Sequence, residues 1–80
     1  MDERNKQINE LLKFYKDKDK PIHITLKSGD WLNGKIISIF NDRLVLDEEK
    51  YGEMLVLFER IKDDGVEPRE KKRGENDKNK

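Results

Sequence analysis

The sequence has no cysteine, so it can form neither a disulfide nor a thiolate metal site. This absence fits a reducing compartment. No apolar run approaches the ~20 residues that a membrane-spanning helix needs. The first residues, from Met1 to Asn5, are too polar for a signal peptide. We therefore expect a cytoplasmic protein without a membrane partner.

The common catalytic patterns are also missing. The sequence shows no nucleophile-elbow motif, no Gly-rich phosphate loop and no histidine-glutamate metal motif. Its single histidine, His23, cannot build a zinc site alone and is interpreted as a strand residue on a polar face. The acidic run at residues 47–49 lacks EF-hand spacing and is interpreted as a solvated loop. We predict that the protein is not an enzyme and has no metal and no cofactor.

Apolar residues are scarce, at 32% of the 80 residues, whereas charged residues make up 45%. A chain of this length can build one compact unit. A core this small seldom supplies more than ~3–5 kcal/mol of stability by itself. Because no disulfide can add to the core, we expect self-association to stabilise the fold.

The charges sum to zero but are unevenly distributed. Residues 1–20 carry six basic and five acidic side chains, residues 21–68 six and ten, and residues 69–80 six and three. The last segment has no apolar residue, so we predict a folded domain over residues 1–68 and a disordered charged tail over residues 69–80. The basic run at residues 71–73 suits phosphate contacts and, equally, a solubilising tail. The acidic middle segment disfavours phosphate binding by bulk electrostatics.

The apolar residues near the start of the chain recur at helical spacing. The members of this stripe are Ile8, Leu11, Leu12 and Tyr15. Their i, i+3, i+4, i+7 pattern places them on one face, which Phe14 widens. Pro21 ends the pattern after a polar run. One short amphipathic helix is therefore predicted.

From Ile22 the apolar period changes to two, which predicts β-strands. The expected strands span residues 22–26, 31–40, 44–46 and 54–58, with turns near 28–30 and 41–43. Gly34 inside the second strand indicates a sharp bend or a bulge. A fifth short strand is expected either at Ile61 or at Val66. The fold class is mainly β with an N-terminal α-helix.

Residues 44–46 and 54–58 are unbroken apolar runs. An antiparallel strand with one wet face alternates, so we expect both runs to be covered on two sides, outside by the helix or by another subunit. This expectation predicts a homo-oligomer with Met54, Val56 and Phe58 at its interface. Trp31 is interpreted as a core or interface residue in preference to a base-stacking one.

One segment resembles a known motif. Residues 26–34, LKSGDWLNG, resemble the first motif of Sm-like proteins, Leu-x-x-Gly-x-x-x-x-Gly. Ile36 and Ile39 match its apolar positions, residues 44–46 resemble its closing strand, and the distance from Gly34 to Leu44 is most similar to the bacterial Hfq branch. The resemblance covers roughly residues 5–68. It implies a five-stranded, strongly bent antiparallel SH3-like barrel, the Sm fold, in rings of six or seven subunits that hold single-stranded RNA near the pore.

The family's binding residues transfer only in part. An Asp commonly lies six residues after the second glycine and an Asn before the apolar strand, where this chain has Phe40 and Arg43. The second family motif, Arg-Gly or in Hfq Lys-His, is replaced by residues 58–60, Phe-Glu-Arg.

Stacking planes and polar groups that read base edges also hold single-stranded RNA. On this chemistry the candidate RNA-binding residues are Phe40, Asn41, Arg43 and Arg60. Asp42 and Glu59 in the same loops repel phosphates. Two functions stay open: an RNA-binding Sm-like ring, and an Sm-fold module that assembles with proteins and does not bind RNA.

Overall fold

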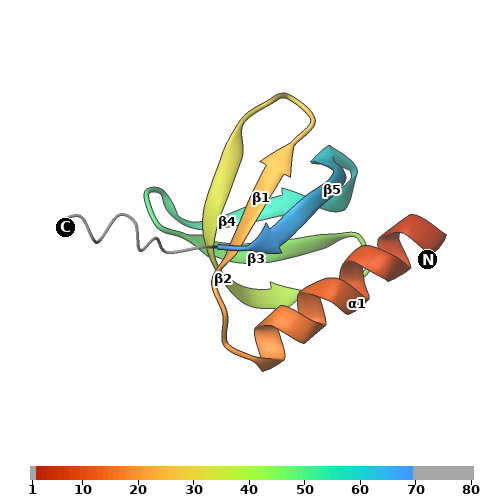
Figure 1. The fold of residues 1–80 in the computed structure, drawn as a ribbon, viewed down its shortest axis with the longest axis horizontal. Helices are drawn as coiled ribbons and strands as arrows, with labels where there is room; N and C mark the ends of the chain where they lie inside the picture. The colour runs from red at the N-terminus through yellow and green to blue at the C-terminus, as the bar shows by residue number, and fades with distance from the viewer. Residues whose placement is uncertain (1, 70–80) are drawn as a thin grey trace.

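The computed structural model describes residues 2–69 as one helix and five strands (Figure 1). The elements are α1 (Glu3–Asp17), β1 (Ile22–Leu26), β2 (Trp31–Ile39), β3 (Arg43–Glu48), β4 (Gly52–Leu57), the 3-10 turn η1 (Phe58–Arg60) and β5 (Ile61–Pro68). All strand pairs are antiparallel, in the order β4-β3-β2-β1-β5. The predicted class, mainly β with an N-terminal helix, is confirmed.

Of the tail predicted over residues 69–80, only Arg69 lies within the described residues. Its backbone N–H donates to the carbonyl of Pro21 at 3.0 Å, and its guanidinium donates to both carboxylate oxygens of Glu49. Arg69 is therefore attached to the folded unit. Among residues 2–69, no helix is long and apolar enough to cross a membrane.

Helix α1 begins at a capped N-terminus and lies along one side of the sheet (Figure 1). The side chain of Asp2 accepts the backbone N–H of Asn5 at 2.7 Å, which satisfies one of the free donors of the first turn. Leu12 is fully buried, as the apolar stripe predicted, and Ile8 and Tyr15 pack beside it. Leu11 is exposed, because α1 covers the sheet with a stripe narrower than expected.

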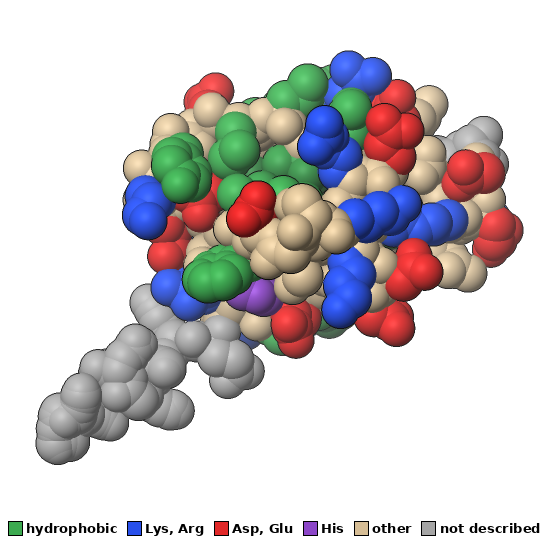
Figure 2. Space-filling view, turned by 90° about the horizontal axis from the view of Figure 1, so that it is seen from above, with side chains coloured by type: hydrophobic (Ala, Val, Ile, Leu, Met, Phe, Trp, Pro, Cys, Tyr) green, Lys and Arg blue, Asp and Glu red, His purple; other side chains and the backbone are tan. Residues whose placement is uncertain are grey.

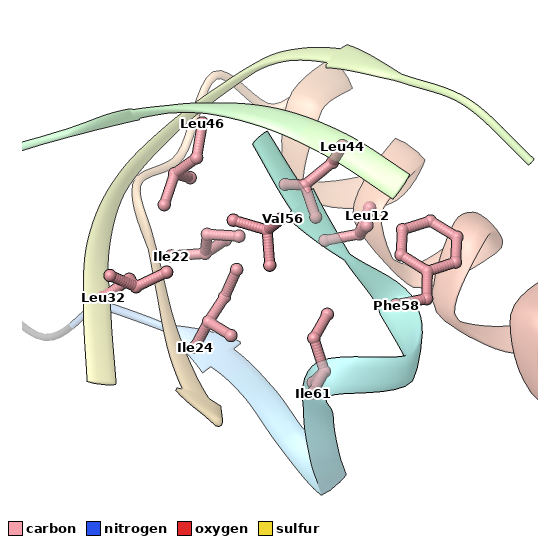
Figure 3. Close-up of a cluster of buried hydrophobic side chains, with 9 residues drawn as sticks. All are labelled: Leu12, Ile22, Ile24, Leu32, Leu44, Leu46, Val56, Phe58 and Ile61. Carbon is pink, nitrogen blue, oxygen red and sulfur yellow. The ribbon is translucent and has the colours of Figure 1, made fainter. Parts of the chain in front are cut away.

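One apolar core joins the helix, all five strands and η1 (Figure 3). Its members are Leu12, Ile22, Ile24, Leu32, Leu44, Leu46, Val56, Phe58 and Ile61. Burying one aliphatic side chain of this size contributes about 1.5–3 kcal/mol. The core therefore joins the first element, α1, and the last, β5, in one cluster of buried side chains.

Gly34 in β2 is required by the close approach of β3. A Cβ atom at this position would lie 2.1 Å from the carbonyl oxygen of Asp47. The register of the β2–β3 pair shifts between Ile36 and Ser38. The irregularity expected at Gly34 thus lies further along the strand.

Strand β5 contains both positions that the sequence left open. Ile61 pairs with Leu26 and Val66 with Ile24, so four residues of β5 bulge out opposite one residue of β1. Asp64 adopts a left-handed φ of 61° within this bulge. The next residue is a buried glycine with no room for a side chain against β1.

Strand β4 at the sheet edge is not covered on both faces within this chain. Val56 is buried and Met54 packs against the core, whereas Leu55 between them is 54% exposed. The run also ends as a strand at Leu57, since Phe58 begins η1. The two-sided cover that we expected is therefore absent from the described part of the chain.

Candidate functional site

Two turns meet at one end of the sheet. The first is the β2–β3 turn, residues 40–42, with Arg43 at the start of β3, and the second is η1. The backbone N–H of Phe58 donates to the carbonyl of Asp42 at 2.9 Å, and that of Phe40 donates to the carbonyl of Arg43 at 2.8 Å. These bonds bring together the two segments that hold the sequence-predicted RNA-binding residues. We call residues 40–43 and 58–60 the loop site.

Phe40 offers an accessible ring on a fixed backbone. Its side chain is 51% exposed, and its carbonyl accepts the side-chain amide N–H of Asn9 at 2.9 Å. Asn9 is itself buried on α1, so the helix anchors the end of β2. Sequence reasoning missed Asn9, although its position three residues before Leu12 on the helix was a signal. A half-exposed ring held in this way is suited to stacking on a base.

Arg43 is already paired within the loop site. Its Nε and Nη2 atoms donate to the two carboxylate oxygens of Asp42 at 2.8 and 3.0 Å. These hydrogen bonds, with the guanidinium charge, hold the pKa of Asp42 below its ordinary value, and the same pair raises the pKa of Arg43. Both groups are exposed, so salt screens the pair. A phosphate that binds Arg43 through these same N–H groups must therefore displace a carboxylate.

Arg60 lies apart from the other three candidate residues. Its carbonyl accepts the backbone N–H of Lys27 at 2.9 Å, which ties η1 to the β1–β2 turn. Its side chain lines a hollow with Lys27 and Ser28, whereas Phe40, Asn41 and Arg43 line another. Three of the four predicted residues are thus adjacent, and the fourth faces a neighbouring turn.

Arg4 braces the loop site from the helix, and sequence reasoning missed it. Its guanidinium donates to the carbonyl of Phe58 at 3.0 Å, to the carbonyl of Ile61, and to the carboxylate of Asp63 at 3.1 Å. These bonds span more than fifty positions of the chain. No local pattern signals such a contact, because the partners of Arg4 lie more than fifty positions away in the chain.

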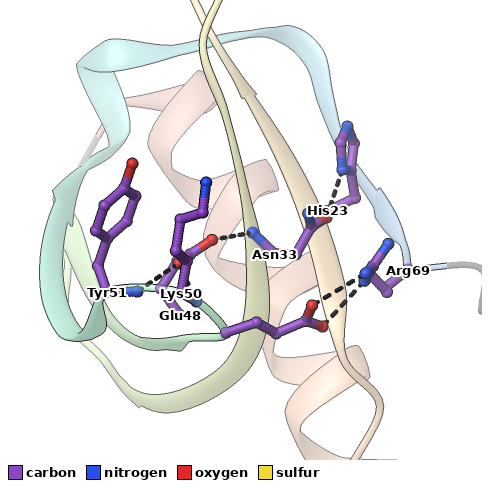
Figure 4. A network of polar contacts seen from close by, with 7 residues as sticks. His23, Asn33, Glu48, Lys50, Tyr51 and Arg69 are labelled. Carbon is purple, nitrogen blue, oxygen red and sulfur yellow. Dashed lines mark hydrogen bonds and ion pairs between the residues drawn. The ribbon is translucent and has the colours of Figure 1, made fainter.

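The opposite end of β3 holds a buried carboxylate, Glu48, which is only 6% exposed. Its two oxygens accept the backbone N–H groups of Asn33 at 3.0 Å, Lys50 at 2.7 Å and Tyr51 at 2.9 Å (Figure 4). Burial raises the pKa of Glu48, but the three hydrogen bonds and the charge of Lys50 outweigh it and bring the pKa below its ordinary value. The solvated loop predicted for residues 47–49 is wrong at Glu48.

His23 forms the hydrogen bond expected of a strand histidine. Its Nδ1 lies 2.6 Å from Oδ1 of Asn33 on the paired strand (Figure 4). Asn33 thus binds His23 through its side chain and Glu48 through its backbone. Across residues 2–69, no group of three His, Cys, Asp or Glu side chains is placed to hold a metal ion.

Comparison with models of known protein families and with curated protein sequences finds no match. The likeness to Sm-like proteins accordingly rests on the motif at residues 26–34 and on the apolar positions that follow it.

The residues predicted for an oligomer interface lie mostly inside the chain's own core. Val56 and Phe58 are buried there, and Met54 packs against them. The most exposed apolar side chain of β4 is that of Leu55, on the same face of the strand as the partly buried Leu57. The apolar run itself carried no such signal, but strand geometry did, because neighbours on a strand point to opposite faces.

Proposed function

We propose that the protein is an Sm-like, ring-forming protein that binds single-stranded RNA at the loop site. The sheet's curvature supports a barrel of the Sm type. Val56 on β4 and Ile61 on β5 belong to one core cluster, although their strands lie at opposite edges of the sheet (Figure 3). In a flat sheet, four strand spacings would separate these edges by about 19 Å. A strongly bent five-stranded sheet explains their shared cluster.

Two edges support ring formation. Within residues 2–69, strands β4 and β5 end the sheet on either side, and each leaves backbone donors and acceptors without a strand neighbour. Pairing β4 of one subunit with β5 of the next is a heterologous contact, which closes into a ring when the rotation permits. Leu55 would add an apolar contact beside that junction.

One observation carries the RNA-binding part of the proposal: Phe40, Asn41 and Arg43 line one hollow at the β2–β3 turn. The hydrogen bond from Phe58 to Asp42 fixes this turn against η1. The site thereby combines a stacking ring, an amide at Asn41 and a guanidinium in one turn. Proteins bind single-stranded RNA with groups of these kinds. In a ring, six or seven copies of the site would face the same pore.

Two measurements test this function. Light scattering on the full chain should give the mass of six or seven subunits, and fluorescence anisotropy should show saturable binding of labelled oligo-uridine or oligo-adenosine. A monomeric mass at high micromolar concentration contradicts the ring. An assembled protein that binds neither oligonucleotide contradicts the RNA site alone.

The second candidate function is a protein-assembly module that does not bind RNA. The pairing of Arg43 with Asp42 favours it, as does Glu59, which lines a hollow together with both residues. These carboxylates oppose phosphate at the loop site. The absorbance ratio of the purified protein at 260 and 280 nm separates the two functions, because only the first predicts co-purifying nucleic acid.

A further inference from the structure

A second hollow lies at the other end of β2 and β3 from the loop site. It has a volume of about 600 Å³. Apolar side chains of Leu26, Leu32 and Met54 line it, together with the aromatic rings of Trp31 and Tyr51. We call it the aromatic hollow. Trp31 begins β2 and residues 40–43 follow its end, so the two sites occupy opposite ends of one strand.

The two rings of the aromatic hollow are unusually exposed for their size. Trp31 is 63% and Tyr51 68% exposed. Of the core or interface role predicted for Trp31, the core role is therefore wrong, and the interface role stays a prediction. Its ring centroid lies 6.5 Å from that of His23, and Figure 2 shows the purple histidine beside exposed hydrophobic side chains. Aromatic residues that gather around one hollow mark a binding surface more often than scattered ones do.

The polar groups around these rings are mainly acidic. Asp30, Glu48 and Glu49 line the hollow, and Lys50 is the one basic residue of the described segment 2–69 that lines it with them. Glu49 pairs with Arg69. Glu48 is different, because its hydrogen-bond donors are backbone N–H groups and it takes part in no ion pair among residues 2–69. The buried negative charge of Glu48 thus lies at the hollow, and no cationic side chain among residues 2–69 is bonded to it.

The ring of Tyr51 already accepts a cation. The Nζ atom of Lys50 lies 5.8 Å from its centroid, within the range of a cation–π contact. An ammonium or a guanidinium from outside can therefore take the place of Lys50 on this ring. The carboxylates at the hollow would repel the phosphates of a nucleic acid.

We propose that the aromatic hollow binds an arginine side chain of a basic peptide segment on a partner protein. A guanidinium is planar, stacks on aromatic faces and bonds carboxylates with two N–H groups at once, whereas an ammonium offers only a point charge. The hollow supplies the faces of Trp31 and Tyr51 and the carboxylate of Asp30. This site is separate from the loop site, so it requires no RNA binding.

The full chain carries its own reporter, because Trp31 is its single tryptophan. We would titrate it with a blocked peptide of four arginines spaced by glycines, and with lysine and glutamate versions of equal length. The arginine peptide should change the Trp31 fluorescence saturably, with an affinity about three- to ten-fold above that of the lysine peptide. The glutamate peptide should have no effect. Equal responses to all three peptides would overturn the proposal.

Matched variants locate the binding. Tyr51→Ala should weaken the arginine peptide about three- to ten-fold, and Tyr51→Phe should restore the affinity because it keeps the ring. Phe14→Ala is the control, since Phe14 is an exposed aromatic residue on α1 with Lys18 5.3 Å from its ring. Melting curves confirm that each variant is folded. Unchanged binding by folded Tyr51→Ala contradicts the site, and a Trp31 response to oligo-adenosine but not to the arginine peptide would assign the hollow to nucleic acid.

Discussion

Two carboxylates at opposite ends of β3 illustrate two ways in which this protein holds a charge. Asp42 stands before the strand and Glu48 at its end, and both have a pKa below the ordinary value. The partner of Asp42 is an exposed guanidinium, whereas the partners of Glu48 are three backbone N–H groups. A ligand can replace the guanidinium beside Asp42. It cannot replace the backbone N–H groups bonded to Glu48 without opening the hairpin.

The two ends of β3 therefore differ in role. At the Glu48 end the carboxylate holds the fold together, whereas at the loop site the side chains can exchange partners. Glu48 fixes the β3–β4 turn to the start of β2, because its two oxygens bond residues of both segments. At the loop site the backbone is held by Phe58 and Arg4, and the Asp42–Arg43 pair adds only an exposed contact. Exposed ion pairs contribute little to stability. The loop site can therefore change its side-chain partners without loss of the fold.

The largest effect is expected for Glu48→Gln. The side-chain amide keeps one acceptor oxygen but presents its N–H₂ group to a backbone N–H, so buried donors lose their partners. We expect the free energy of unfolding to fall by about 1–3 kcal/mol, measured by urea denaturation. The control is Glu49→Gln, which removes an exposed pair with Arg69 and should cost about 0–1 kcal/mol. Equal losses of unfolding free energy in the two variants would show that Glu48 stabilises the fold no more than an exposed carboxylate does.

The pH dependence of stability should distinguish the same residue. The pKa of Glu48 in the folded chain is lowered from 4.5, so the unfolded chain binds more protons as the pH falls through this value. Its contribution is complete above the ordinary pKa and is lost as the pH falls toward the folded one. The parent should therefore lose stability more steeply below about pH 5 than Glu48→Gln does. Parallel curves of unfolding free energy against pH would contradict this linkage.

The sequence predicted the elements well where periodicity determined them. The apolar alternation of residues 22–26 corresponds to β1, and helical spacing placed Leu12 in the core. The same alternation also held the correct answer for Trp31, since its neighbour Leu32 points into the core and adjacent strand residues face opposite sides. The prediction of a core or interface role for Trp31 is thus wrong for the core, and its interface part stays a prediction.

Long-range and backbone partners were beyond sequence reasoning. The turn with Phe40, Asn41 and Arg43 was predicted, but its bracing by Arg4 depends on which face of α1 meets η1. The role of Glu48 depends on backbone N–H groups, which every residue except proline carries and which give no sequence signal. The candidate site was therefore predictable as a list of chemical groups and not as a bonded arrangement.

Phe40→Ala should weaken RNA binding at the loop site. If a base stacks on the ring, the loss should be about 1–3 kcal/mol of binding free energy, measured by anisotropy with labelled oligo-uridine and oligo-adenosine. Because Phe40 is half exposed, the variant should remain folded and assembled, which its melting curve and light scattering check. Phe14→Ala serves as the aromatic control on α1. A folded variant that binds both oligonucleotides as the parent does would favour the protein-assembly function.

The smallest effect is expected for Asp42→Asn, which removes the internal competitor for Arg43. The freed guanidinium can bond a phosphate, so affinity for oligo-uridine should rise a few-fold at low salt, and the slope of log K against log salt should steepen by about one contact. Asp30→Asn removes the same charge from the opposite end and serves as the control. Acidification to pH 5 should not reproduce the gain, because the lowered pKa of Asp42 keeps its carboxylate ionised there. If Asp42→Asn instead weakens binding while Asp30→Asn does not, the carboxylate orients Arg43 toward the RNA, and the pair is part of the recognition surface and not a barrier to it.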